Sequence, residues 1–244
     1  MKKIYIVGLG PGNEAMMTPA AREAIDKSSV VVGYEVYVDL IRPLLAGKTV
    51  ATTSMKKEVD RCQMALEYAL AGETVSMVCS GDAGVYGMAG VMMEVAREHP
   101  EVEMEVVCGI TAACSAAAVL GAPLIHDFAV ISLSDLLTPW EKIEKRLQLA
   151  ADADFVICLY NPSSKKRSDY LRKACDLVLQ YQAPETCCGY VRNIGREGEQ
   201  ATLCSLSELR LAEVDMFTTV IIGNSQTKVI NGRLVTPRGY MIEK

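Results

Sequence analysis

The sequence has few histidines and no clustered cysteines, and this shortage argues against a metal protein. Its only two histidines, His99 and His126, stand apart in the chain, and its nine cysteines form no C-x-x-C pair. Structural zinc and iron–sulfur sites need ligands at close and regular spacing, so we expect no metal. The odd number of cysteines, several of them in apolar runs, indicates buried reduced thiols in a reducing compartment.

The sequence also lacks a long apolar run and an excess of positive charge. No stretch reaches the ~18 uninterrupted apolar residues that a membrane-spanning helix needs. The apolar run after Lys2-Lys3 has no signal-peptide cleavage pattern, and we interpret it as a strand. The net charge is −5, whereas nucleic-acid-binding proteins are normally basic. We therefore expect a cytoplasmic protein with neither a membrane nor a nucleic acid as partner.

Half of the 244 residues are hydrophobic, which is enough to bury a core. Short β-branched runs alternate with helical patterns through the first half of the chain. This alternation implies a mostly parallel sheet covered by helices on both faces. The expected strands are 4–7, 30–32, 49–51, 74–79 and 102–107, and the expected helices are 20–27, 36–45, 58–71, 88–98 and 112–120.

The alternation becomes less regular after Gly121-Ala122-Pro123. We place a domain boundary there, which gives two α/β lobes at 1–122 and 123–244. Asn231-Gly232 is a favoured two-residue hairpin turn and predicts an antiparallel end to the second lobe. The second lobe is expected to have strands at 129–133, 155–160, 187–192, 201–205 and 218–222, helices at 140–150 and 164–181, and a hairpin at 229–235.

A glycine-rich loop, Gly8-Leu9-Gly10-Pro11-Gly12, follows the first expected strand. The dinucleotide fingerprint G-x-G-x-x-G fails because position 13 is Asn. Pro11 also removes a backbone donor, and the cap of the next helix, Thr18, comes too late for a phosphate cradle. The loop is therefore either a plain tight turn or a site for close approach of a ligand other than phosphate.

Other loops also follow expected strands, at the edge where α/β sheets bind ligands. In the segment 80–87, Asp82 could accept hydrogen bonds from an amine or hydroxyl of a ligand, or it could cap the next helix. The small residues of 108–118 admit close approach either by a flat ligand or by another structural element. The basic clusters at 165–167 and 192–196 suit the binding of carboxylates, with a solvated surface run as the alternative.

The sequence contains GLGPGN at 8–13, SGDAGVYG at 80–87, CGITAACSAAAVLGAP at 108–123 and TTVIIGNSQT at 218–227. In this order, the four motifs resemble the tetrapyrrole (corrin/porphyrin) methyltransferase family over essentially the whole chain. The segments 126–141, 159–167 and 191–199 resemble its precorrin-3B C17-methyltransferase (cobalt-factor III methyltransferase) branch. The chain departs from the family at Asn13, where Asp is commoner, and at Ala83, where Pro is commoner. Asn13 leaves that loop without a charge for handling the substrate.

The resemblance implies a fold, a cofactor and a reaction. The expected fold is two α/β lobes with a cleft between them that binds S-adenosylmethionine, as in class III methyltransferases, in a homodimer. The expected reaction is methylation of C17 of precorrin-3B or cobalt-factor III, with ring contraction, in cobalamin biosynthesis. The sequence leaves open whether this tetrapyrrole contains cobalt.

The resemblance also carries the family's site over to positions of this chain. The implied cofactor contacts are Leu9, Gly81, Asp82, Ala83, Val85, Tyr86, Thr111, Ala112, Tyr160, Asn161, Thr218 and Thr219. The candidate substrate contacts are Gly10, Pro11, Gly12, Arg192 and Arg196. Ring contraction needs acid–base help, for which the candidates are His126, Asp127, Ser132 and Ser134, expected to cluster beside the cleft.

Three other functions compete with this hypothesis. The first is an NAD(P)-binding oxidoreductase that uses the loop at 8–12. The second is another corrin-ring methyltransferase of the same family. The third is a tetrapyrrole carrier with the same fold and no catalytic activity. Binding of NAD(P)H would favour the first, and binding of a corrinoid precursor without methyl transfer would favour the third.

Overall fold

The computed structural model describes residues 2–164 and 168–241. Contacts within the chain divide it into two compact units, Met1–Ala112 and Ala113–Lys244. Helix α5 (Ala112–Leu120) therefore lies almost wholly in the second unit, whereas the sequence boundary at residue 122 placed it in the first. The physical reason is packing, because the Leu120 methyls lie about 3 Å from the position that a Cβ on Gly189 would occupy.

The first unit is built on a five-stranded sheet in the order β3-β2-β4-β1-β5. Every neighbouring pair in it is parallel, as the alternation of strands and helices predicts. The β-branched and apolar runs of the central strands β2, β4 and β1 are buried on both faces, whereas the edge strands β3 and β5 are mostly exposed. The strands are β1 (Lys3–Gly8), β2 (Val30–Tyr34), β3 (Thr49–Thr53), β4 (Thr74–Cys79) and β5 (Glu103–Val107).

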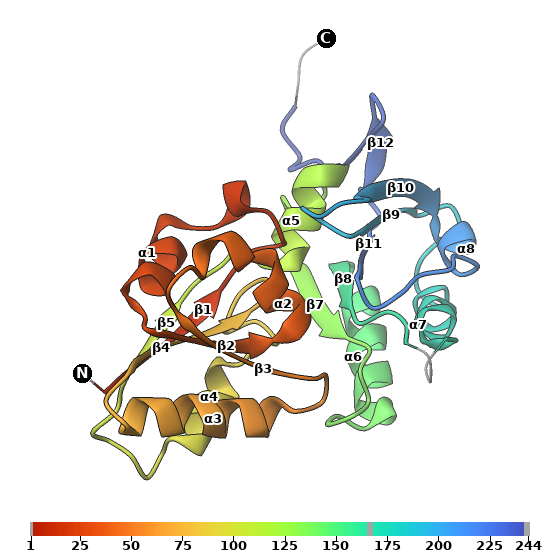
Figure 1. The fold of residues 1–244 in the computed structure, drawn as a ribbon. Helices are drawn as coiled ribbons and strands as arrows, with labels where there is room; N and C mark the ends of the chain where they lie inside the picture. The colour runs from red at the N-terminus through yellow and green to blue at the C-terminus, as the bar shows by residue number, and fades with distance from the viewer. Residues whose placement is uncertain (1, 165–167, 242–244) are drawn as a thin grey trace. The chain divides into compact units, whose positions relative to one another are not determined.

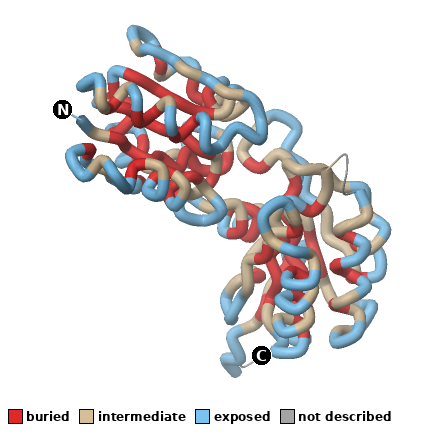
Figure 2. The backbone as a smooth tube through the Cα atoms, turned by 90° about the horizontal axis from the view of Figure 1, so that it is seen from below, coloured by how far each residue is buried: buried red, intermediate tan, exposed pale blue. Residues whose placement is uncertain are grey.

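Helices cover both faces of this sheet (Figure 1). Alternate residues of β1 point to opposite faces: Ile4 and Ile6 pack in the core under α3 and α4, whereas Tyr5 and Val7 pack under α1 and α2. In Figure 2 the buried segments, coloured red, lie in the centre of this unit. Its helices are α1 (Pro19–Lys27), α2 (Glu35–Leu40), α3 (Glu58–Leu70) and α4 (Ala89–Val95), with short 3-10 turns η1 (Glu14–Met16) and η2 (Arg42–Leu44).

Local sequence signals explain where these helices begin and end. The Thr18 hydroxyl accepts a hydrogen bond from Ala21 N at 3.1 Å, and Pro19 occupies the first turn of α1. Gly72 follows α3 with a φ of +100°, a conformation that suits glycine. The expected helix 36–45 ends at Leu40 instead, because Pro43 lacks the N–H that an α-helix would need.

The second unit has a mixed sheet in the order β10-β9-β11-β8-β7. Only β7 and β8 run parallel, and the other pairs are antiparallel. The strands are β7 (Phe128–Ser132), β8 (Val156–Tyr160), β9 (Cys187–Arg192), β10 (Gln200–Ser205) and β11 (Thr218–Ile222). Helices α6 (Trp140–Asp152), α7 (Tyr170–Val178) and α8 (Leu206–Leu209) pack against one face of this sheet through a shared apolar core.

A small third sheet completes the second unit. The predicted hairpin is confirmed, since β12 (Lys228–Ile230) and β13 (Arg233–Val235) are joined by Asn231 and Gly232 with φ of 50° and 72°. Strand β13 also pairs with the two-residue strand β6 (Gly121–Ala122), which the sequence did not predict. A two-residue strand is too short to produce an alternating pattern of apolar and polar residues in the sequence.

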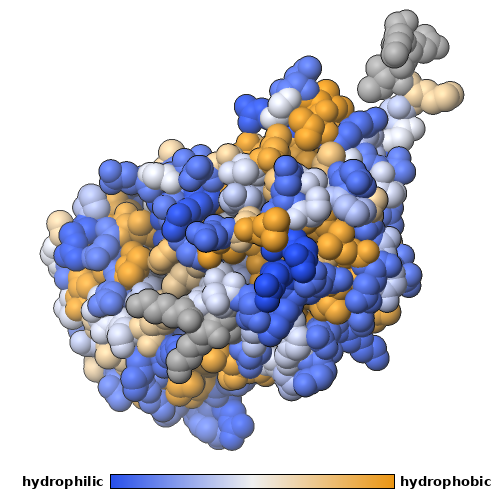
Figure 3. All heavy atoms as spheres, turned by 90° about the vertical axis from the view of Figure 1, so that its right-hand side faces the viewer, coloured by the Kyte–Doolittle hydropathy of each residue, from blue (hydrophilic) through white to orange (hydrophobic). Residues whose placement is uncertain are grey.

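On the face drawn in Figure 3, hydrophilic and apolar side chains are interspersed. Such a mixture is ordinary for a protein surface. Within the described residues, none of the helices combines the length and the apolar character needed to cross a membrane.

Candidate functional site

Three loops of the first unit meet at one edge of its sheet. Strands β4, β1 and β5 are neighbours and parallel, so the segments that follow them leave the sheet at the same edge. Gly10 N donates to Gly81 O at 3.0 Å, and Gly81 N donates to Gly10 O at 2.8 Å. These two bonds join the loop 8–13 to the loop 80–87, as the positions of the motifs after the strands predict.

Glycine is required here because the backbones of the loops touch. A Cβ on Gly109 would lie 2.2 Å from Gly81 O and 2.5 Å from Gly8 O. A Cβ on Gly8 would lie 2.7 Å from the same Gly81 oxygen. Any side chain at these positions would force the loops apart, so the sequence gives the edge a surface of backbone groups.

Asp82 holds two of these loops together. Its Oδ1 accepts hydrogen bonds from Gly84 N at 2.8 Å and Val85 N at 3.1 Å. Its Oδ2 accepts one from Gly109 N at 2.9 Å, in the loop after β5. The N-cap of α4 is Met88, so Asp82 does not cap that helix. Both carboxylate oxygens of Asp82 already accept hydrogen bonds from backbone N–H groups, so few acceptor positions remain for a ligand.

The rest of the loop 80–87 separates into a buried part and an exposed part. Ala83 is fully buried, whereas Val85 and Tyr86 are 37% and 57% exposed. Tyr86 has a φ of 53°, a left-handed conformation that is unusual for a bulky side chain. Gly87 follows, and a Cβ there would lie 2.4 Å from Ala83 O. The tight turn thus directs Val85 and Tyr86 outward.

In the second unit, predicted site residues meet where β7 and β8 end. The Tyr160 hydroxyl accepts a hydrogen bond from Ala113 N at 2.7 Å, in the first turn of α5. Asn161 has a φ of 53°, and its Nδ2 donates to Ser132 Oγ at 2.9 Å. Ser134 N donates to the same oxygen at 3.2 Å. The structure therefore brings four predicted residues of this unit together: Tyr160, Asn161, Ser132 and Ser134.

Thr218 and Thr219, both buried, begin β11 near that same edge, because Val220 pairs with Leu159 in the antiparallel register. The Thr218 hydroxyl donates to Asp215 Oδ1 at 2.9 Å. Asp215 was not singled out from the sequence, where it has no motif around it.

The two arginines proposed to bind substrate also have partners in the structure. Arg192 forms an ion pair with Asp215. The Arg196 guanidinium lies 5.6 Å from the centre of the Phe217 ring. The basic cluster Lys165–Arg167, also considered for carboxylate binding, lies outside the described residues.

The four acid–base candidates do not form one cluster. His126 and Asp127 are exposed and precede β7, whereas Ser132 is the last residue of that strand. At ~3.3 Å per residue, the extended chain from His126 or Asp127 to Ser132 spans roughly 15–20 Å. Only Ser132 and Ser134 lie at the edge where Tyr160 and Asn161 are found.

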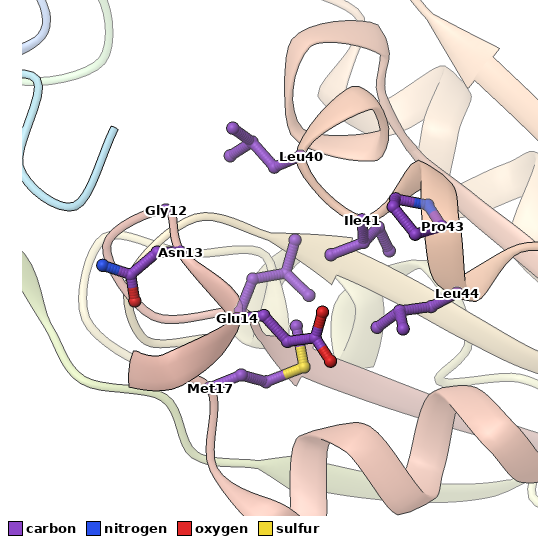
Figure 4. A pocket seen from close by; sticks show the side chains of 9 residues that line it. Gly12, Asn13, Glu14, Met17, Leu40, Ile41, Pro43 and Leu44 are labelled. Carbon is purple, nitrogen blue, oxygen red and sulfur yellow. The ribbon is translucent and has the colours of Figure 1, made fainter. Parts of the chain in front are cut away.

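A pocket lies beside the loop that contains the predicted substrate contacts Gly10, Pro11 and Gly12 (Figure 4). Asn13 Oδ1 accepts a hydrogen bond from Met16 N at 2.8 Å, a role that an aspartate could also fill. The carboxylate of Glu14 forms an ion pair with Arg22. The lining is mostly apolar: Leu9, Gly12, Asn13, Glu14, Met17, Leu40, Ile41, Pro43 and Leu44.

The groups at these edges suit binding and orientation of a ligand. Burial raises the pKa of Cys79, which directly precedes the loop 80–87, to about 11, so this thiol stays protonated at neutral pH. Within the described residues, no group of three or more His, Cys, Asp or Glu could hold a metal ion. Most of the polar groups described at these two edges are backbone amides, backbone carbonyls and hydroxyls. Such groups suit a ligand that already carries its own leaving group.

Comparisons of the whole sequence agree with one another. The profile of the family described as Tetrapyrrole (Corrin/Porphyrin) Methylases matches residues 3–210. A probable cobalt-factor III C(17)-methyltransferase of Salmonella typhimurium is 47% identical over 98% of this chain and 100% of its own length. A precorrin-3B C(17)-methyltransferase of a Sinorhizobium species is 40% identical over 97% of this chain and 96% of its own.

Solved structures have the same fold. The crystal structure of the methyltransferase CobJ gives a TM-score of 0.89 at 37% identity, covering 96% of this chain and 99% of that one. Uroporphyrin-III C-methyltransferase from Thermus thermophilus, complexed with S-adenyl homocysteine, gives 0.75 at 21% identity over 91% and 97% of the two chains. These relatives are methyltransferases, so the oxidoreductase alternative gains no support.

Proposed function

The chain belongs to the tetrapyrrole (corrin/porphyrin) methylase family, and we propose that it methylates C17 of cobalt-factor III or precorrin-3B in cobalamin biosynthesis. The methyl donor would be S-adenosylmethionine, and the macrocycle would contract in the same reaction. The observation that carries the proposal is 47% identity to a C(17)-methyltransferase over the full length of that relative. We also propose, from the resemblance alone, that the protein is a cytoplasmic homodimer.

The glycine-lined edge of the first unit fits the chemistry of such a donor. S-adenosylmethionine presents an adenine, ribose hydroxyls and an amino-acid group, which need both donors and acceptors close to them. Backbone N–H and C=O groups supply both, and Gly8, Gly81 and Gly109 leave them uncovered by side chains. We propose that Leu9, Gly81, Ala83, Val85, Tyr86, Thr111 and Ala112 hold the donor there, and that Asp82, the other predicted contact in this unit, positions their loops. The further contacts from Tyr160, Asn161, Thr218 and Thr219 stay predictions of the resemblance.

When bound, the donor supplies a methyl group on a sulfonium, an activated leaving group, so the protein needs no nucleophile of its own. The residues of this chain then have to bind, orient and exclude water. Asp82 contributes by fixing the loop 80–87 against Gly109, which keeps the backbone groups of both loops in place. Its role in this proposal is positioning rather than direct contact.

Ring contraction requires proton transfer in addition to methyl transfer. Ser132 and Ser134, which share one hydrogen-bond cluster with Asn161, are the candidates that would act together. His126 and Asp127 precede β7 and would have to act at a separate place. We keep all four as candidates for variants in the turnover assay.

The proposal is tested by anaerobic turnover with donor that carries a deuterated methyl group. Cobalt-factor III and precorrin-3B are supplied in separate reactions, and the product is analysed by mass spectrometry. We expect one of the two macrocycles to gain one labelled methyl group, together with one equivalent of S-adenosylhomocysteine.

Two other outcomes would contradict the proposal. Binding of a macrocycle without methyl transfer would favour the carrier. Binding of NADPH, measured by its fluorescence, would favour the oxidoreductase.

A further inference from the structure

Among the residues that the structure describes, a buried arginine of the first unit has only neutral partners. Arg61, in the first turns of α3, is 5% exposed. Its Nε donates to Thr53 Oγ1 at 3.0 Å, its Nη2 to Ser54 O at 3.4 Å, and its Nη1 lies 3.8 Å from Met88 Sδ. Within the residues 2–164 and 168–241, no aspartate or glutamate forms an ion pair with it.

Such a cation lowers the stability of the folded protein unless an anion joins it. Removal of a guanidinium from water is unfavourable, and neutral acceptors offset this cost only in part. A guanidinium has five N–H groups, and the three contacts of Arg61 leave one N–H on each Nη. The two Nη atoms of a guanidinium form the fork that matches a carboxylate. An apolar side chain would fill the same space at lower cost.

The position of Arg61 relative to the sheet indicates which ligand it would bind. Tyr34 and Thr53 are the last residues of β2 and β3, and Met88 follows the loop after β4. These strands are adjacent and parallel, so Arg61 lies at the same edge as the loop 80–87. Ser54 is exposed, which leaves one side of the cluster open to solvent.

We propose that Arg61 binds a carboxylate side chain of the macrocyclic substrate. This inference rests on the proposed function, in which the substrate is a tetrapyrrole with acidic side chains. The Tyr34 ring lies 5.9 Å from the guanidinium and supports the cation from another side. The proposed donor loops follow β4, β1 and β5, whereas Arg61 lies over β2 and β3, on the other side of β4. The carboxylate of the amino-acid group of the donor is therefore the less suitable partner.

The test compares two ligands in two variants. Arg61→Met removes the charge at similar volume, and Arg61→Lys keeps the charge but not the fork. Uroporphyrin I, which carries eight carboxylates, is titrated by its absorbance, and S-adenosylhomocysteine is titrated by calorimetry. Arg97→Met is the matched control, because Arg97 is exposed and paired with Glu98.

We expect Arg61→Met to raise the Kd for uroporphyrin I at least tenfold and to change the Kd for S-adenosylhomocysteine less than twofold. Arg61→Lys should give an intermediate loss, and Arg97→Met no loss. Unchanged porphyrin affinity in Arg61→Met, or equal losses for both ligands, would overturn the inference, as would absence of porphyrin binding by the unaltered protein. If Arg61→Met does not fold, the same comparison is made with Arg61→Lys. The inference then requires that the Kd of this variant for uroporphyrin I rise at least threefold, and a smaller rise overturns it.

These outcomes are separate from those of the turnover assay. A protein that binds porphyrin through Arg61 and transfers no methyl group would refute the proposed function and leave the carboxylate site in place. A protein that transfers the methyl group with unchanged porphyrin affinity in Arg61→Met would do the reverse.

Discussion

Asp82 and Gly109 are joined by a hydrogen bond of 2.9 Å from the Gly109 N–H to Asp82 Oδ2. The two residues follow β4 and β5, and β1 lies between these strands in the sheet. The Asp82 carboxylate therefore joins the loops on either side of the loop that follows β1. Gly10, in that middle loop, is itself hydrogen-bonded to Gly81. The three glycine-lined loops form a single hydrogen-bonded assembly, and this relationship is the basis of the first two predictions.

The first prediction concerns Asp82→Asn. An asparagine keeps the size of the side chain but replaces one acceptor oxygen by an NH₂ group, so at least one backbone N–H loses its partner. We expect the free energy of unfolding, measured in urea, to fall by about 1–3 kcal/mol. Affinity for S-adenosylhomocysteine should fall as well, because the loops lose their alignment. Asp60→Asn, which removes only an exposed pair with Lys57, is the control. Equal stability of the two variants would contradict the role given to Asp82.

The second prediction compares two glycines in the first unit. Gly109→Ala places a Cβ 2.2 Å from Gly81 O, so we expect a loss of several kcal/mol of stability or insoluble protein. Gly90, within α4, has no atom within 4 Å of its Cβ position. Gly90→Ala should therefore stabilise the protein by up to about 1 kcal/mol through helix propensity. The check is urea unfolding of both variants, and a Gly109→Ala protein as stable as the unaltered chain would show that the loops are not in contact.

The third prediction concerns the Tyr160 hydroxyl, which accepts from Ala113 N in the first turn of α5. Tyr160→Phe leaves that N–H without its acceptor, and we expect a loss of about 0.5–1.5 kcal/mol in unfolding free energy. Tyr181→Phe serves as the control, because Tyr181 is 46% exposed. Hydrogen exchange should show faster exchange at the start of α5 in Tyr160→Phe alone. Unchanged protection there would show that the hydroxyl does not stabilise the helix.

The fourth prediction is that stability falls at alkaline pH. Burial raises the pKa of the Cys158 thiol from 9.0 to about 12. The unfolded thiol ionises near pH 9, whereas the folded one stays protonated, so unfolding releases a proton between these values. The contribution of the Cys158 thiol to the free energy of unfolding is therefore complete below pH 9 and is lost as the pH rises towards 12.

Urea unfolding at pH 8 and pH 10.5 measures this loss. Cys158→Ala removes one such thiol, so the fall in its unfolding free energy between the two values should be smaller than that of the unaltered chain. An equal fall would show that Cys158 does not contribute to the pH dependence.

Much of the fold was readable from local patterns. Thr18-Pro19 predicted the start of α1 because a hydroxyl cap and a first-turn proline act within one turn of helix. Asn231-Gly232 predicted the hairpin for the same reason, since both residues tolerate positive φ. Helix α8 was missed although its capping box, Ser205 with Glu208, is a local signal, because the helix itself has only four residues.

The candidate site was only partly readable. The loops 8–13 and 80–87 were recognised from glycines after expected strands, and the structure brings them into contact. The four acid–base candidates were expected to cluster beside the cleft, yet β7 separates His126 and Asp127 from Ser132. Arg61 gave no signal, because an arginine in an amphipathic helix is ordinarily exposed.

By itself, the sequence determined the alternation of strands and helices, the parallel sheet of the first unit and the glycine-rich loops at strand ends, because each depends on neighbours within a few residues. Only the tertiary structure decided that the acceptors of Asp82 serve backbone amides of two loops and that Arg61 is buried with no acidic partner among the described residues. Hydrogen-bond partners and burial depend on segments brought together from far along the chain, and a local pattern carries no information about them.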